Sequence, residues 1–85
     1  MSQANILERL QPIFRDVFDD EDITVRPETT AEDVEGWDSL MHVSLMINIE
    51  RAFGVRFSTT EVASMTNVGE LARLLEQRIA GGGRA

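Results

Sequence analysis

The residues with the clearest chemical potential form the segment Gly-Trp-Asp-Ser-Leu at positions 36–40. Asp38 has the side chain of a helix N-cap, so we expect Ser39 to be the first residue of the following helix. A serine at this position points outward, near backbone N–H groups that have no partner inside the helix. A phosphodiester on its hydroxyl would lie against the positive end of the helix dipole, an interaction worth roughly 0.3–1 kcal/mol at an exposed site. Ser39 therefore suits an esterified phosphate.

Ser39 lacks the neighbours that would make it the nucleophile of an enzyme. A catalytic serine needs an adjacent base, but the one histidine, His42, lies three residues further on, and the chain has no lysine and no cysteine. These absences also exclude a disulfide framework, a thiolate metal site and a metal site built on two histidines. We predict no catalytic residue and no metal ligand, and we interpret Ser39 as the substrate of another enzyme.

The composition indicates one small acidic globular domain. The 85 residues are 42% hydrophobic and 27% charged, a balance that allows a packed core. The net charge is −7, and eleven of the fifteen acidic residues lie at or before Asp38. Such a charge repels nucleic acid and favours basic protein surfaces, although acids that merely maintain solubility are the alternative. No apolar run approaches a membrane span and no targeting pattern opens the chain, so we expect a soluble cytoplasmic protein that binds no membrane.

Apolar periodicity predicts a first helix and then a long loop. Residues 3–18 carry a stripe of apolar side chains at helical spacing, which is formed by Ile6, Leu10, Ile13 and Val17. The acidic run at positions 19–22 ends this helix. Residues 19–37 show no strong helical period, and a loop of this length needs anchoring side chains. The expected anchors are Ile23, Val25, Val34 and Trp37, and residues 30–33 are expected to form at most a short turn.

Three further helices follow the loop. The most apolar helix is predicted from Ser39 to Phe53, with Gly54 as its C-terminal stop. Ser58 and Glu61 have the spacing of a capping box, which opens a short third helix. A last helix begins at position 66 or 67, where Asn67 and Glu70 form a second box-like pair. The predicted fold is therefore all-α, a four-helix bundle with a short third helix and a long loop between the first and second helices. One domain is expected over residues 1–80, with a flexible glycine-rich tail at 81–85.

At this point the chain resembles the acyl carrier protein family, over essentially residues 3–80. Asp-Ser-Leu alone is a weak signal, because most serines after an N-cap aspartate are ordinary first-turn residues. The longer matching segments are residues 36–40, 49–55, 57–58 and 67–71, together with Val62 and Met65. The resemblance implies that Ser39 receives 4′-phosphopantetheine from coenzyme A through a separate phosphopantetheinyl transferase. Asp38 and Leu40 complete the attachment motif.

The resemblance also implies where an acyl cargo lies. Acyl groups ride as thioesters on the terminal thiol of the arm, and the chain can fold back into a cleft between the second and third helices. The candidate lining residues here are Ile49, Phe57, Val62 and Met65, which would otherwise be plain core residues. A short helix with few apolar contacts is the element most able to move aside for cargo.

The expected partner surface departs from the family pattern. Typical fatty-acid carriers have acidic residues two and five positions after the modified serine, where this chain has Met41 and Ser44. We expect partner recognition to involve Trp37, an exposed Met41 beside Leu40, and the remaining acid Glu50. His42 would add a positive charge at mildly acidic pH, or it is an exposed helix residue without a role. This surface favours a carrier dedicated to one specialised pathway.

The sequence-based function is a monomeric acyl carrier of a fatty acid, polyketide or related lipid pathway, and not an enzyme. Its expected partners are a phosphopantetheinyl transferase and acyl-loading or acyl-processing enzymes with basic or apolar docking patches. Three alternatives remain open: a peptidyl or aminoacyl carrier of a non-ribosomal-type pathway, a four-helix interaction module that is never modified, and a signalling domain with Ser39 as a kinase target.

Overall fold

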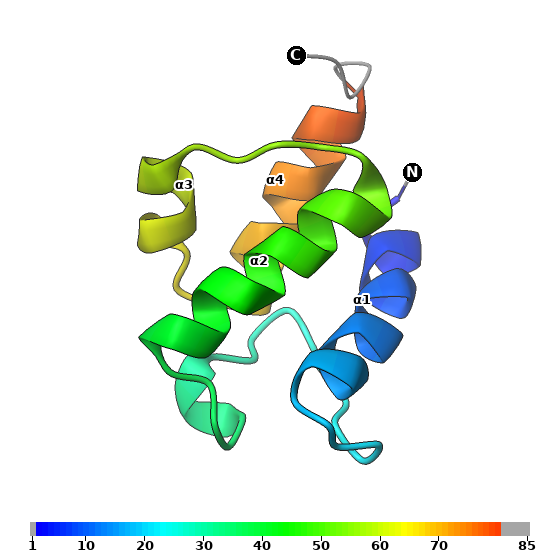
Figure 1. Ribbon diagram of the computed structural model, residues 1–85. Helices are drawn as coiled ribbons and strands as arrows, with labels where there is room; N and C mark the ends of the chain where they lie inside the picture. Colours follow the sequence, from blue (N-terminus) through cyan, green and yellow to red (C-terminus); the bar gives the residue numbers. More distant parts are fainter. Residues whose placement is uncertain (1, 81–85) are drawn as a thin grey trace.

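The computed structural model describes residues 2–80 and shows, within that part of the chain, four α-helices, one 3-10 turn and no strand (Figure 1). In chain order the elements are α1 (Gln3–Val17), η1 (Ala31–Asp33), α2 (Ser39–Phe53), α3 (Thr59–Ser64) and α4 (Val68–Ala80). The predicted all-α bundle, with its short third helix and its long loop between α1 and α2, is confirmed. The tail predicted at 81–85 lies outside the described residues.

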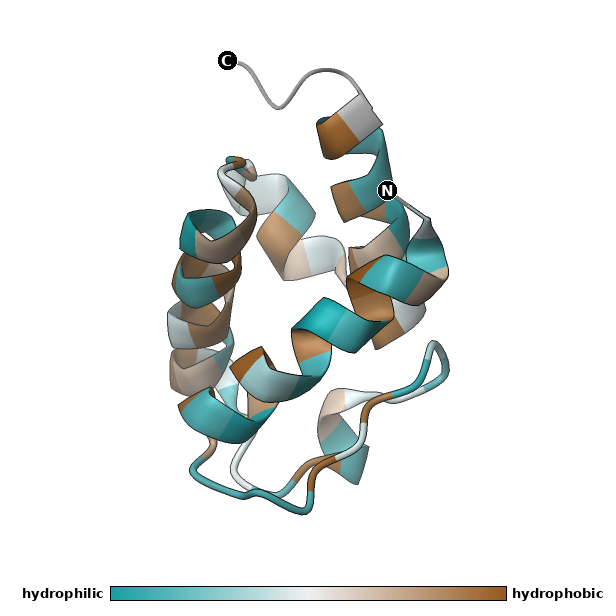
Figure 2. Cartoon of the chain, turned by 90° about the vertical axis from the view of Figure 1, so that its right-hand side faces the viewer, coloured by the Kyte–Doolittle hydropathy of each residue, from teal (hydrophilic) through white to brown (hydrophobic). Residues whose placement is uncertain are grey.

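The core is formed where α1, α2 and α4 meet. Each of these helices turns a stripe of apolar residues inward, and Figure 2 shows apolar and polar residues alternating along the ribbons. The largest fully buried side chains are Phe14, Ile6, Leu10, Leu45, Ile49, Leu71, Leu75 and Val68. The first helix ends at Val17, and Phe18 forms its C-cap instead of its last turn.

Local capping sets the limits of α2 as the sequence predicts. The Asp38 carboxylate accepts a hydrogen bond from the backbone N–H of Met41 at 2.9 Å, which satisfies one of the unpaired donors at the start of the helix. At the other end Gly54 has a φ of 67°, in the left-handed region where a side chain would be strained. The helix therefore begins at Ser39 and ends at Phe53.

Polar side chains of α1 and backbone groups of α4 hold the long loop. The Arg15 guanidinium donates to the carbonyl of Ile23 at 2.7 Å, and Gln11 bonds Val25. The first N–H groups of α4 donate to loop carbonyls, Val68 to Thr29 at 2.9 Å and Gly69 to Pro27 at 2.7 Å. The apolar anchors predicted for the loop also face inward: Val25 and Val34 are buried, and Ile23 and Trp37 are half-buried against the core.

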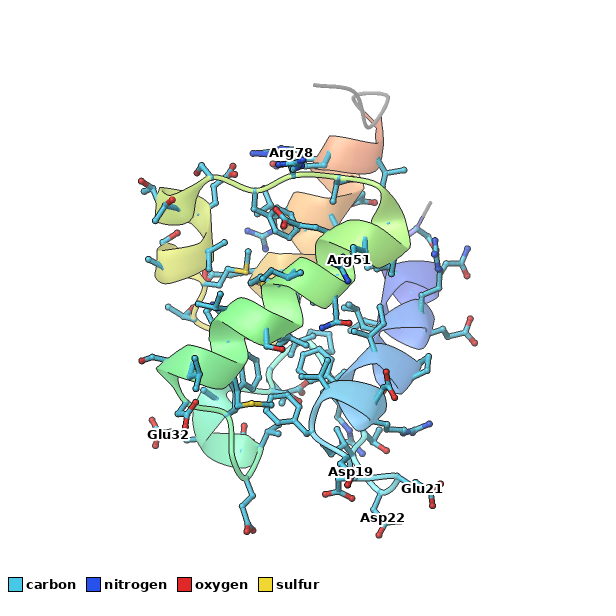
Figure 3. The ribbon with its side chains drawn as sticks, viewed as in Figure 1. Asp19, Glu21, Asp22, Glu32, Arg51 and Arg78 are labelled. Atoms are coloured by element: carbon cyan, nitrogen blue, oxygen red, sulfur yellow. The ribbon has the colours of Figure 1, made fainter. Side chains whose placement is uncertain are left out.

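The acidic residues of the loop lie away from the bundle core. Asp19, Glu21, Asp22 and Glu32 are exposed and project from the loop end of the molecule, far from Arg78 on α4 (Figure 3). The strongest concentration of negative charge is therefore located at one end of the bundle.

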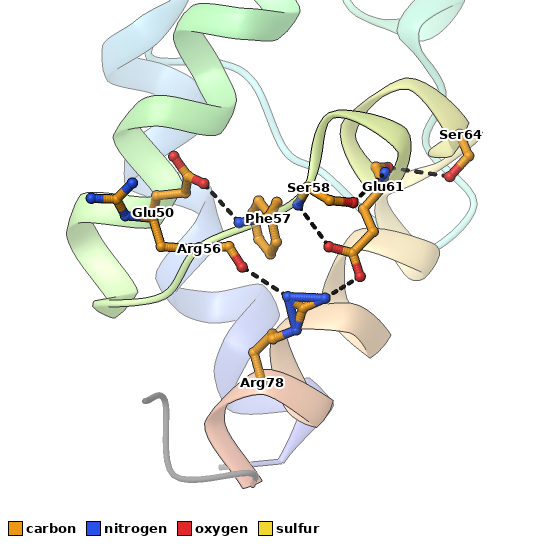
Figure 4. A network of polar contacts seen from close by, with 7 residues as sticks. All are labelled: Glu50, Arg56, Phe57, Ser58, Glu61, Ser64 and Arg78. Carbon is orange, nitrogen blue, oxygen red and sulfur yellow. Dashed lines mark hydrogen bonds and ion pairs between the residues drawn. The ribbon is translucent and has the colours of Figure 1, made fainter. Parts of the chain in front are cut away.

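The short helix α3 has no fully buried residue, and its half-buried Val62 packs against the core. The predicted capping box is present: Ser58 Oγ accepts from the N–H of Glu61 at 3.1 Å, and the Glu61 carboxylate accepts from the N–H of Ser58 at 2.8 Å. The Arg78 side chain on α4 pairs with the same carboxylate and donates to the carbonyl of Arg56 at 2.8 Å (Figure 4). These contacts fasten the start of α3 to α4.

The box-like pair expected at the start of α4 forms only in part. Asn67 Oδ1 accepts from the N–H of Glu70 at 2.9 Å, as predicted. The Glu70 carboxylate, however, accepts from the backbone N–H of Thr66 at 2.8 Å and from the Thr66 hydroxyl. The helix begins at Val68 because the carbonyls of the long loop, and not a reciprocal box, satisfy its first N–H groups.

Candidate functional site

Ser39 is exposed at the start of α2, on a turn that the preceding residues shape. Gly36 has a φ of 88°, a conformation that strongly favours glycine, and its carbonyl accepts from the N–H of Asp38 at 3.0 Å. Asp38 then caps the helix, and Leu40 projects outward with 78% of its surface exposed. The attachment motif predicted from the sequence thus lies at an accessible helix N-terminus, with the hydroxyl of Ser39 outside the core.

A cavity of about 600 Å³ opens directly beside Ser39. It lies between the first half of α2, the helix α3 and the turn that leads into α4. Asp38 is the one carboxylate among its lining residues, and most of the wall is apolar. The lining residues are Ala31, Trp37, Asp38, Ser39, His42, Val43, Met46, Thr59, Val62, Ala63, Met65, Thr66, Asn67 and Leu71. We call this space the Ser39 cavity.

Of the four residues predicted to line a cleft, two line the Ser39 cavity and two do not. Val62 and Met65 are lining residues. Ile49 is fully buried in the core, because it is on the same face of α2 as Leu45. Phe57 is half-buried against the core from the segment between α2 and α3. Val43 and Met46 line the cavity in their place. Neither was among the predicted lining residues, although both lie within two helical turns of Ser39.

Trp37 and His42 bond each other at the edge of the cavity. The Trp37 indole N–H donates to His42 Nδ1 at 3.0 Å, and the two rings stack with their centroids 5.8 Å apart. His42 Nε2 lies 2.8 Å from the carbonyl oxygen of Val62. The indole also packs edge-on against Phe14, at 5.4 Å between centroids, and in a tilted arrangement against Phe18, at 6.0 Å. His42 is thus half-buried and bonded on both sides, which differs from the exposed residue without a role that the sequence allowed.

The exposed apolar surface of α2 differs from the one predicted. Met41, expected to be exposed, is half-buried. The large apolar residues that are exposed are Leu40, Val43 and Ile47, at 78%, 52% and 44%. Their spacing of three and four residues places them on one face of the helix, and we call them the α2 apolar stripe. Glu50 accepts a hydrogen bond from the N–H of Phe57 at 2.8 Å, so part of its carboxylate serves the fold.

The electrostatics around α3 favour ionised carboxylates. The hydrogen bond from the Ser58 backbone, together with the charge and hydrogen bond of Arg78, lowers the pKa of Glu61. Hydrogen bonds from the hydroxyl and the backbone of Thr66 lower the pKa of Glu70. Within residues 2–80 no group of three histidine or acidic side chains is arranged to hold a metal ion. No helix in this part of the chain combines the length and apolarity needed to cross a membrane.

Comparisons with known proteins agree with this geometry. A family model described as the phosphopantetheine attachment site matches residues 8–75, a segment that contains Ser39. The solution NMR structure of a holo acyl carrier protein from Geobacter metallireducens is similar to this chain, with a TM-score of 0.84 and 41% sequence identity. The similarity covers 89% of this chain and 87% of that one. The fold and site define a carrier domain that is modified by a prosthetic group. The chain belongs to the phosphopantetheine attachment family, and its cofactor is covalently bound 4′-phosphopantetheine.

Proposed function

We propose that this protein is an acyl carrier, consisting of a single monomeric domain over residues 1–80, with its 4′-phosphopantetheine arm on the hydroxyl of Ser39. The observation that carries the proposal is the position of Ser39, which is exposed at the start of α2 and also borders the 600 Å³ cavity. A covalent arm needs an accessible oxygen and space for a flexible chain, and these residues provide both. The similarity to a holo acyl carrier protein supports the same proposal.

The residues around Ser39 suit its role as the substrate of a phosphopantetheinyl transferase. The Ser39 oxygen forms a phosphodiester bond with the phosphopantetheine phosphate of coenzyme A, whose pyrophosphate bond breaks so that adenosine 3′,5′-bisphosphate leaves. The hydroxyl proton passes to a base that the transferase supplies, since no base of this chain touches the hydroxyl in the described contacts. Asp38 holds the first turn of α2, which keeps the hydroxyl outward. The N-terminal end of the helix favours the negative charge of the resulting phosphodiester. When bound, the arm supplies a terminal thiol on which acyl groups are carried as thioesters.

The α2 apolar stripe favours partner enzymes with apolar docking patches. Large exposed apolar side chains on one helix face are a feature of protein interaction surfaces, and Leu40 lies next to the proposed attachment residue. The exposed loop acids are at the same end of the bundle as the start of α2 (Figure 3). A partner with an apolar patch beside basic residues would match both features. We propose on this basis that the carrier serves one specialised pathway.

Intact mass spectrometry tests the attachment residue. The full chain is incubated with coenzyme A and a broad-specificity phosphopantetheinyl transferase, together with the variants Ser39→Ala and Ser44→Ala. Ser44 is a matched control, because it is a second exposed serine on α2. We expect the wild type and Ser44→Ala to gain one phosphopantetheine and Ser39→Ala to gain none. Modification of Ser39→Ala would show that another residue holds the arm. If the wild type from its native host also lacks the added mass, the carrier proposal is wrong.

The same α2 surface supports one second candidate, an aminoacyl carrier. Glu50 is the only acidic residue of α2, whereas the resemblance associates fatty-acid carriers with several acids on this helix. Loading assays separate the two candidates. The modified protein is offered to acyl transferases and to amino-acid adenylating enzymes, and the mass of the attached group identifies the cargo class.

A further inference from the structure

The helix α3 forms one wall of the Ser39 cavity although Val62 is the one residue of this helix that packs, half-buried, against the core. It contains six residues, none of them buried, and Thr59, Val62 and Ala63 face the cavity. Helices in small domains are usually held by an apolar face. The start of α3 instead depends on Ser58, and on Glu61 with its partner Arg78. At the end of α3, Val62 and Met65 are half-buried against the core, and α2 adds one polar contact.

His42 supplies that polar contact from α2. The last carbonyl groups of a helix have no donor within the helix, and Val62 belongs to the last turn of α3. His42 Nε2 lies 2.8 Å from the Val62 carbonyl oxygen, so a histidine of one helix caps the C-terminal end of another. The His42 side chain spans the cavity edge between α2 and α3.

The partners of His42 also determine which of its nitrogens carries the proton. An indole N–H can only donate, so Nδ1 of His42 must accept the hydrogen bond from Trp37. A carbonyl oxygen can only accept, so Nε2 must carry the proton that bonds Val62. Both requirements are met by one neutral tautomer. Trp37 is itself held by Phe14 and Phe18 of the α1 segment, so the contacts run without a gap from α1 to α3.

We propose that His42 is a positioning residue that ties α3 to α2 and thereby maintains the Ser39 cavity as a site for an apolar chain. The inference rests on the proposed function, in which the cavity lies beside the arm. It assigns the histidine a role in cargo protection and not in chemistry. His42 accepts a hydrogen bond at Nδ1 and donates one at Nε2. A side chain that offers the same acceptor and donor should therefore preserve the contact between α2 and α3.

The variants His42→Leu and His42→Gln test this requirement in the full, unmodified chain. Leucine fills similar space without hydrogen bonds, whereas the glutamine amide offers one acceptor and one donor group. The chain has a single tryptophan, so one indole N–H resonance reports on the bond to residue 42. We expect the backbone amides at positions 62–65 to exchange with solvent roughly three- to tenfold faster in His42→Leu, the range that corresponds to one hydrogen bond. His42→Gln should resemble the wild type, as should the surface control Ser44→Ala.

Either of two results in the exchange spectra would refute the proposal that hydrogen bonds of His42 hold α3 to α2. The first is wild-type exchange at positions 62–65 in His42→Leu. The second is exchange in His42→Gln as fast as in His42→Leu, which would mean that ring packing and not hydrogen bonding is what matters. Amides of the buried α1 face, such as Leu10 and Phe14, monitor global stability. If exchange at these core amides also becomes faster in His42→Leu, that variant is globally destabilised. The comparison of His42→Gln with the wild type then tests whether the hydrogen bonds of residue 42 hold α3.

A second experiment tests the consequence for cargo. The transferase attaches an octanoylated arm from octanoyl-coenzyme A, or an unacylated arm from coenzyme A, and the methyl resonances of Met46 and Met65 are compared between the two products. We expect both to shift in the wild type and in His42→Gln, and at least half of the shift to be lost in His42→Leu. Equal shifts in all three proteins would overturn the link between His42 and the cavity. No shift in the wild type would show that the cargo does not enter the cavity. The contact between His42 and α3 would still be tested by the exchange data, and the attachment residue by the mass data.

Discussion

Gln11 of α1 bonds both backbone polar groups of Val25 in the long loop. Its amide nitrogen donates to the Val25 carbonyl and its amide oxygen accepts from the Val25 N–H, both at 2.8 Å. Val25 is 3% exposed, so its backbone groups would otherwise be buried without partners. A primary amide has the donor and acceptor that this pair requires. The Gln11 side chain thus pairs with both the N–H and the carbonyl of one loop residue, as the backbone of a neighbouring β-strand would.

Replacement of Gln11 should destabilise the fold. In Gln11→Ala the Val25 N–H and carbonyl lose their partners, and we expect the free energy of unfolding to fall by about 1–3 kcal/mol. Gln11→Glu should also destabilise, because it keeps the acceptor but turns a second oxygen toward the Val25 carbonyl. Urea denaturation measures both. Gln3→Ala is the control, since Gln3 makes only an exposed hydrogen bond, to Glu76 at 3.1 Å, and should change stability by less than about 0.5 kcal/mol. Equal effects at positions 3 and 11 would refute this role of Gln11.

The stability of the protein should decrease on acidification through the carboxylates around α3. Contacts with Ser58 and Arg78 lower the pKa of Glu61 in the folded state, and contacts with Thr66 lower that of Glu70. A carboxyl with a depressed pKa stabilises the fold above its ordinary titration range, and this contribution is lost as the pH falls through the folded-state pKa. The effect is limited because both groups are solvent-accessible.

The measurement is the free energy of unfolding at a series of pH values, for the wild type and for a Glu61→Gln, Glu70→Gln double variant. We expect the double variant to show a shallower decline between neutral and acidic pH, and to be less stable than the wild type at neutral pH. Parallel curves for the two proteins would show that other carboxylates account for the acid sensitivity.

The parts of the fold that depend on local capping could be predicted from the sequence. Asp38, Gly54 and the pair Ser58 and Glu61 set helix limits through contacts within four residues, and the structure has these limits where the sequence places them. The apolar stripe of α1 could be predicted in the same way, because Ile6 and Leu10 recur at the helical period and are buried. The other two predicted members, Ile13 and Val17, are half-buried, and Phe14 completes the buried stripe. The place of Ser39 as the first residue of α2 could be predicted for the same reason, since it follows from the Asp38 cap.

The parts that depend on contacts between distant segments could not be predicted. Nothing near His42 in the sequence indicates that it meets the carbonyl of Val62, twenty positions away. The broad apolar face of α2 likewise does not reveal which residues face the core and which face the cavity. Ile49 and Met46 are both buried in the core, but only Met46 also lines the cavity, although both occupy the same kind of position in a highly apolar helix.

Two leucines of α2 should differ sharply in their effect on stability. Leu45 is fully buried and Leu40 is 78% exposed. We expect Leu45→Ala to lower the free energy of unfolding by about 2–5 kcal/mol, through lost burial and the remaining void. Leu40→Ala should change it by less than about 0.5 kcal/mol. Chemical denaturation monitored by circular dichroism measures both. A large loss in Leu40→Ala would mean that this side chain serves the fold, which would remove it from the α2 apolar stripe.

At Gly69, replacement of glycine by alanine should destabilise the protein, although helix propensity alone would favour alanine. Alanine is normally better than glycine in a helix by about 1 kcal/mol. A Cβ atom at Gly69, however, would lie 2.9 Å from the carbonyl oxygen of Pro27 and 3.3 Å from its Cβ. That carbonyl also accepts the N–H of Gly69 at 2.7 Å, so the loop cannot move away without breaking the bond that starts α4.

We therefore expect Gly69→Ala to lower the free energy of unfolding by about 1–3 kcal/mol, the cost typical of an overpacked site. Because the strain acts on the loop, the amides of Val68 and Gly69 should lose protection from hydrogen exchange before those of the α1 core. Gln77→Ala, on an exposed position of the same helix, is the matched control and should leave stability nearly unchanged. An unchanged or stabilised Gly69→Ala protein would show that the loop adjusts without cost, and that the contact between Pro27 and α4 does not position the loop.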